Sequence, residues 1–110
     1  HNVRCWLVNT GWTGGPYGVG KRMALAHTRA MIRAALEGKL DTVPTRRDPV
    51  FGLEVPTAVP SVPAGVLDQR STWKDAGKYD AAAAKLADMF RENFKTFASQ
   101  VTEAVRKAGP

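Results

Sequence analysis

The spacing of apolar positions changes along the chain, and the first two changes predict a strand followed by a loop. Residues 3–9 are almost continuously apolar, which is typical of a short strand buried on both faces. Cys5 within this run is expected to be a small buried side chain. Residues 11–20 contain five glycines and a proline, which predicts a tightly bent loop and argues against a helix or a strand in a ladder.

Apolar side chains then recur every three or four residues, and this periodicity predicts a helix over residues 23–38. The apolar stripe consists of Leu25, Thr28, Met31, Ile32, Ala35 and Leu36. Gly38 is expected to end the helix. Arg29, Arg33 and Glu37 lie four residues apart on another face, where we expect them to meet solvent or a partner.

Five prolines interrupt every periodic pattern in the next part of the chain, residues 39–74. They predict extended chain, with a short edge strand over residues 50–55 where apolar and other positions alternate. Such a segment has few apolar partners in this chain, which hints that it packs on a further surface.

Residues 75–108 predict terminal helices, a long one and a second short one over residues 100–107. The apolar stripe of the long helix contains Tyr79, Ala83, Leu86, Phe90, Phe94 and Phe97. Burying one phenylalanine is worth about 1.5–3 kcal/mol, so we expect this helix to dock against a larger body of protein.

Composition places the 110 residues among ordinary soluble sequences, because 44% are hydrophobic and 24% are charged. The chain has no apolar run long enough to cross a membrane. It starts at His1 without an initiator methionine or the pattern of a secretion signal, so we expect a piece of a longer chain, residues 1–110 being part of one domain. A single cysteine fits a reducing cytoplasm.

The formal net charge of +6 suits an anionic partner, either nucleic acid or the phosphates of a nucleotide. The basic residues are spread along the chain and alternate with acidic ones in the last helix, which favours solvated helix faces. A small basic nucleic-acid-binding module remains an alternative, because Trp6, Trp12 and Tyr17 lie near positive charge.

The loop from Gly15 to Lys21 has the spacing of a phosphate-binding loop, with two glycines four residues apart and a lysine directly after. The next position should be Ser or Thr to bind magnesium, but it is Arg22, which weakens the hypothesis of a phosphate-loop kinase. A guanidinium can instead lie flat on an aromatic base. Thr28 should present its hydroxyl on the same side, so both residues are candidate contacts to a base or ribose.

The contiguous string from Cys5 to Met23 closely resembles the carboxy-terminal part of ATP-dependent phosphoenolpyruvate carboxykinases. The resemblance covers nearly the whole chain and weakens only beyond Phe97. It continues through residues 28–36, 48–53, 55–56, 62–63 and 67–73, and through Leu86, Ala87, Phe90, Asn93, Phe94 and Phe97.

The resemblance implies the α/β fold class, as the carboxy-terminal portion of a mixed α/β nucleotide-binding domain: strand and glycine-rich loop (1–22), helix (23–38), proline-rich segment (39–74) and terminal helices (75–108). It implies a cytoplasmic lyase that converts oxaloacetate and ATP to phosphoenolpyruvate, carbon dioxide and ADP. Arg22, Met23 and Thr28 would contact the adenosine side of ATP.

The same resemblance implies that the phosphate loop, the ligands of Mg²⁺ or Mn²⁺ and the oxaloacetate-binding arginines lie upstream in the same chain. No catalytic residue and no metal ligand is expected within this chain, since His1 and His27 lack a second ligand at a metal-site spacing. We therefore expect the chain to be inactive alone, with ATP, oxaloacetate and the upstream remainder as its partners and neither nucleic acid nor a membrane among them.

Overall fold

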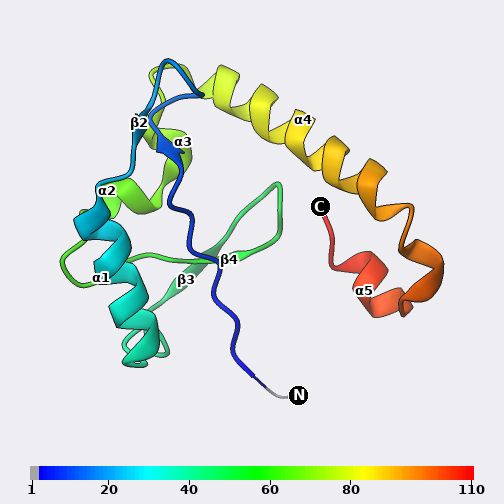
Figure 1. The fold of residues 1–110 in the computed structure, drawn as a ribbon, viewed down its shortest axis with the longest axis horizontal. Helices are drawn as coiled ribbons and strands as arrows, with labels where there is room; N and C mark the ends of the chain where they lie inside the picture. Colours follow the sequence, from blue (N-terminus) through cyan, green and yellow to red (C-terminus); the bar gives the residue numbers. More distant parts are fainter. Residues whose placement is uncertain (1–2) are drawn as a thin grey trace.

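A computed structural model describes residues 3–110, in which two pairs of short strands are separated by a helix and followed by further helices (Figure 1). In chain order the elements are β1 (Trp12–Thr13), β2 (Lys21–Arg22), α1 (Leu25–Leu36), β3 (Thr45–Arg47), β4 (Glu54–Pro56), α2 (Ala64–Leu67), α3 (Gln69–Thr72), α4 (Ala76–Phe94), the 3₁₀ helix η1 (Ala98–Gln100) and α5 (Glu103–Lys107). The strands form two separate antiparallel pairs, β1–β2 and β3–β4. The predicted mixed α/β class is confirmed.

The predicted buried strand over residues 3–9 is wrong for this chain. The segment is extended but belongs to no ladder, and Val3 and Leu7 are 71% and 83% exposed. Cys5, expected to be buried, is exposed as well. An apolar run indicates that a strand will be covered, but it cannot supply the neighbouring strands, and residues 3–110 contain none that pairs with it.

The glycine-rich loop is confirmed as a tight bend, but it is a hairpin and not an isolated loop. Trp12 pairs with Arg22 and Thr13 with Lys21, so the expectation of no ladder strand within residues 11–20 is wrong. Glycine is required at position 20, because a Cβ there would lie 2.3 Å from the carbonyl oxygen of Gly15.

Helix α1 lies within the predicted range, and the chain reverses directly after it. Gly38 adopts a positive φ of 68°, and the N–H of Lys39 donates a hydrogen bond of 2.9 Å to the carbonyl of Ala34. The predicted apolar stripe is only partly covered. Of its members Thr28 is buried, whereas Leu25 and Leu36 are 60% and 84% exposed; Ala34, which is also buried, lies outside the predicted stripe.

The proline-rich segment contains more structure than predicted. The strand expected over residues 50–55 begins only at Glu54, where β4 pairs with β3. The residues before it form a turn, because the Asp48 carboxylate accepts hydrogen bonds from the N–H groups of Val50 and Phe51 at 2.9 and 2.7 Å. Helices α2 and α3 were not expected, since each has only four residues and no periodicity can develop over that length.

The long terminal helix is confirmed as α4, which leads away from α3 in Figure 1. Asp75 caps its start by accepting a hydrogen bond of 3.1 Å from the N–H of Lys78. Phe97 lies beyond its end, and the short helix α5 begins at Glu103, three residues later than predicted. The apolar stripe of α4 is largely uncovered, with Phe90 53% exposed.

The core is small for a chain of this length. The residues of the main cluster are Ala34, Leu40 and Val59, with Trp6 and Met31 packed against them. The accessible surface of 8377 Å² exceeds the about 5,900 Å² typical of a compact monomer of 11.9 kDa. The radius of gyration, 15.4 Å, likewise exceeds the about 13 Å of a 100-residue domain.

None of the helices within residues 3–110 combines the length and the apolar character needed to cross a bilayer.

Candidate functional site

The β1–β2 hairpin places Arg22 beside an aromatic pair. Arg22 and Trp12 are direct cross-strand partners, and such partners project from the same face of a ladder. The ring of Trp12 meets the ring of Tyr17 edge to face, with centroids 5.1 Å apart. Trp12 is 38% exposed and Tyr17 is 83% exposed, so the aromatic pair and the guanidinium share an accessible surface.

Arg22 is exposed, and it makes no ion pair with any residue of the range 3–110. Five of the arginines elsewhere in that range are bound to carboxylates, as Arg70 is to Asp80 and Arg91 to Asp88, or donate to backbone carbonyls, as Arg106 does to Val101. The Arg22 guanidinium therefore has no carboxylate partner within the described part of the chain.

The other two predicted site residues are less accessible. Met23 is half-buried, and its N–H donates a hydrogen bond of 3.0 Å to the carbonyl of Gly11 next to the hairpin. Thr28 is only 5% exposed, on the face of α1 that is turned toward the rest of the chain. The three predicted site residues thus differ in exposure: the Arg22 side chain is exposed, Met23 is half-buried and Thr28 is buried.

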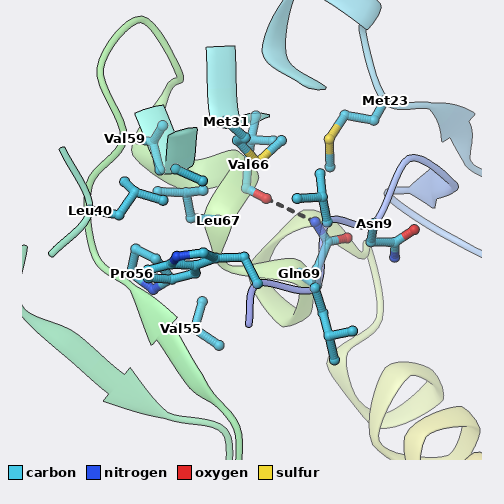
Figure 2. A pocket seen from close by; sticks show the side chains of 14 residues that line it. Asn9, Met23, Met31, Leu40, Val55, Pro56, Val59, Val66, Leu67 and Gln69 are labelled. Carbon is cyan, nitrogen blue, oxygen red and sulfur yellow. Dashed lines mark hydrogen bonds between the residues drawn. The ribbon is translucent and has the colours of Figure 1, made fainter. Parts of the chain in front are cut away.

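A pocket of about 150 Å³ includes Met23 but neither Arg22 nor Thr28 among its lining residues (Figure 2). Its walls are mainly apolar and come from residues 6–9, α1, β4, α2 and α3. One polar group within it, the Gln69 amide, donates a hydrogen bond of 2.8 Å to the carbonyl of Val66. The pocket is smaller than the about 300 Å³ at which ligand pockets begin, so it cannot enclose a nucleotide by itself.

The hairpin is held by a residue far along the chain. The N–H of Gly14 donates to the hydroxyl oxygen of Thr72 at 3.0 Å, and that hydroxyl donates to the carbonyl of Gln69 at 2.7 Å. Thr13 lies 3.4 Å from the same hydroxyl. No local pattern marks Thr72 as a supporting residue; its one signal in the sequence is its place within the family-like string of residues 67–73.

An ion pair connects α3, which carries Thr72, to α4. The Nε and Nη2 groups of Arg70 donate to the two carboxylate oxygens of Asp80 at 2.8 and 2.9 Å. These hydrogen bonds, with the positive charge of Arg70, lower the pKa of Asp80.

Tyr79 precedes Asp80 in α4, and burial raises the pKa of its phenol. Its ring meets the ring of Trp73 edge to face, with centroids 5.5 Å apart.

The hairpin geometry argues against a phosphate-binding loop at Gly15–Lys21. A phosphate loop runs from a strand into the start of a helix, whose N–H groups bind the phosphates. Here Lys21 lies in β2, and α1 begins only at Leu25. Within residues 3–110, moreover, no group of three His, Cys, Asp or Glu side chains is arranged to hold a metal ion.

Comparison with known proteins agrees with the resemblance. A family profile described as "Phosphoenolpyruvate carboxykinase" matches residues 1–65. The chain is 59% identical over 110 residues to "Phosphoenolpyruvate carboxykinase (ATP)" of Rubrobacter xylanophilus and 57% identical over 110 residues to the protein of that name from Thermus thermophilus. Each alignment covers 100% of this chain and 21% of the relative.

The chain therefore spans about a fifth of the length of the curated relatives that it matches. The family profile covers more than half of the chain, and the identity is high along all of it. On this evidence the chain belongs to the phosphoenolpyruvate carboxykinase family.

Proposed function

We propose that these residues form part of an ATP-dependent carboxykinase, in which they bind the adenosine side of ATP. The whole enzyme converts oxaloacetate and ATP to phosphoenolpyruvate, carbon dioxide and ADP. Loss of carbon dioxide leaves an enolate, and the enolate oxygen takes the γ-phosphoryl group of ATP, so atoms and charge balance. The chain described here binds and orients the nucleotide and is inactive alone.

The observation that carries this proposal is the exposed guanidinium of Arg22. It lies opposite Trp12 on a hairpin that Thr72 ties to α3, and it makes no ion pair within residues 3–110. A planar cation held in this way can stack on a purine base and donate hydrogen bonds from its edge. Met23 would support the base, and the Thr28 hydroxyl would become accessible to the ribose only with a change in its surroundings.

The other groups that the reaction needs would come from residues upstream of the 110 described here. Phosphoryl transfer needs metal ions that bridge the phosphates and a cluster of positive charges that holds them. We place the ligands of Mg²⁺ or Mn²⁺, the phosphate loop and the oxaloacetate site in the upstream remainder of the same chain, in a cytoplasmic enzyme. The large apolar surface left uncovered here, including Leu7 and Phe90, supports such a partner.

The test is the substitution Arg22→Ala in the full-length enzyme, with ATP binding measured by calorimetry. Loss of a stacked, hydrogen-bonding arginine should weaken binding by about 1–2 kcal/mol, or roughly five- to thirtyfold. Lys21→Ala is the matched control, because Lys21 is the neighbouring exposed cation on the same strand. We expect it to change ATP affinity much less.

Equal affinity of Arg22→Ala and the unaltered enzyme would remove the site assignment. A large loss in Lys21→Ala alone would instead support phosphate binding by the loop. If the full-length enzyme did not convert oxaloacetate at all, the proposed reaction itself would be wrong, independently of the nucleotide site.

A further inference from the structure

A second cluster of positive charge is formed by α1 and the residues that directly follow it. Arg29, Arg33 and Lys39 line an open pocket of about 400 Å³, whose remaining lining residues are Ala26, Ala30, Ala34, Glu37, Pro60 and Ser61. None of Arg22, Met23 and Thr28 takes part in it. From these residues we infer that the pocket binds the phosphate group of a small molecule.

The positions of the three cations follow from the local fold. Arg29 and Arg33 are four residues apart, so they project from the same side of α1 on successive turns. Lys39 returns to that helix because Gly38 reverses the chain, and the N–H of Lys39 is bonded to the carbonyl of Ala34. Alanines line this part of α1, and their small side chains leave the space that the cations border.

The charge of the pocket matches a phosphate dianion. Glu37 is the acidic member, and its carboxylate lies 2.6 Å from the ammonium group of Lys39. The hydrogen bond from Lys39, together with the charges of Lys39 and Arg33, lowers the pKa of Glu37, so it stays ionised at neutral pH. Neither Arg29 nor Arg33 forms an ion pair with residues 3–110. Three cations and one anion leave a net charge of +2, with both guanidinium groups available.

The lining of the pocket also contains a strained residue. Ser61 has a φ of 63°, and within residues 3–110 it is the one residue other than glycine with a positive φ. This backbone conformation is unfavourable for serine, and such strain persists where the surrounding structure enforces it, often at ligand sites. The turn that holds Ser61 is closed by a hydrogen bond of 3.1 Å from Val62 to Val59, and Val59 is anchored in the core beside Ala34.

In the proposed site the Ser61 hydroxyl is a donor to the bound phosphate. Two guanidinium groups and this hydroxyl, all from residues that line the pocket, would then donate hydrogen bonds to the phosphate oxygens. The inference does not depend on the nucleotide site proposed above.

The test is equilibrium dialysis of radiolabelled inorganic phosphate against the full-length enzyme, with ATP present at saturation so that a nucleotide site is filled. We expect one phosphate per chain to bind in addition to ATP. Each of the substitutions Arg29→Gln and Arg33→Gln should weaken this phosphate binding about tenfold. Arg33→Lys should retain part of it. Lys85→Gln removes an exposed cation on another helix and should leave phosphate binding unchanged.

Ser61→Gly separates binding from folding, because it removes the hydroxyl and also relieves the strain. The variant should have a melting temperature no lower than that of the unaltered enzyme and yet bind phosphate more weakly.

Competition with an alkyl phosphate and with acetate identifies the ligand. Tighter binding of the alkyl phosphate indicates a phosphorylated metabolite, and tighter binding of inorganic phosphate indicates the free ion. Two results would overturn the inference. One is undiminished phosphate binding in the Arg29→Gln/Arg33→Gln double variant, and the other is acetate binding as strong as phosphate binding.

Discussion

The backbone N–H of Gly14 donates a hydrogen bond of 3.0 Å to the hydroxyl of Thr72, 58 residues further along the chain. The bond fixes the bend of the glycine-rich hairpin against the end of α3. Because Arg22 lies in the returning strand of that hairpin, its position depends on a segment in which the sequence predicts only extended chain.

Thr72→Val should loosen the hairpin with little change of side-chain shape. It leaves the Gly14 N–H without its partner, so we expect a loss of about 1 kcal/mol in the free energy of unfolding of the full-length enzyme. ATP affinity should fall in parallel if Arg22 binds the base. The control is Thr96→Val, since Thr96 is exposed and its hydroxyl bonds only to the nearby carbonyl of Asn93. Identical stability of the two variants would contradict the role of Thr72.

Gly20→Ala should disrupt the hairpin strongly. Its Cβ would lie 2.3 Å from the carbonyl oxygen of Gly15 and 2.7 Å from that of Thr13, and both are backbone atoms that cannot rotate away. We expect a destabilisation of about 2 kcal/mol or more, measured by chemical denaturation. Gly65→Ala is the matched control, because its added Cβ in α2 would meet nothing within 4 Å beyond its chain neighbours and the backbone of its own helix. It should be neutral or slightly stabilising. Equal effects of both substitutions would show that the close approach at Gly20 is absent.

The Arg70–Asp80 pair should stabilise the junction of α3 and α4 in a pH-dependent way. Arg70 lowers the pKa of Asp80 below its usual value of 3.8, so the carboxylate binds its proton more weakly in the folded state than in the unfolded one. The stabilisation is therefore fully present above about pH 4 and is lost as pH falls through the lowered pKa.

The measurement compares the free energy of unfolding of Arg70→Gln with that of the unaltered protein as a function of pH. The difference should be present at pH 7 and shrink below about pH 4. It should be small throughout, because the pair is exposed to solvent. Lys85→Gln, which breaks no ion pair within residues 3–110, should show no such acid dependence. A constant difference from pH 7 down to pH 2 would contradict the assignment.

Cys5 reports whether the apolar segment 3–9 is covered in the longer chain. Its thiol is exposed here, so a maleimide should label the isolated chain rapidly. If upstream residues cover the segment, labelling in the full-length enzyme should be at least about tenfold slower, because the site must first open locally. Mass spectrometry of the peptide containing Cys5 distinguishes this thiol from others. Equal labelling rates would show that the segment stays uncovered.

Local properties of the chain could be predicted from the sequence alone. The spacing of Met31 and Ala35 with their neighbours, and Gly38 at the end, determine where α1 runs, because helix periodicity and termination depend on residues close in sequence. The glycines of residues 11–20 likewise determine a tight bend. The family could also be inferred from the sequence, because its characteristic residues form a contiguous string.

Only the tertiary structure decided which groups meet and which face solvent. It set Trp12 opposite Arg22, attached Gly14 to Thr72, buried Thr28 and left Cys5 uncovered. These outcomes depend on contacts between residues far apart in the chain, and no local pattern encodes the partner of an apolar run or of a single hydroxyl. The sequence determined which surfaces need covering, and the tertiary structure determined which of them this chain covers itself.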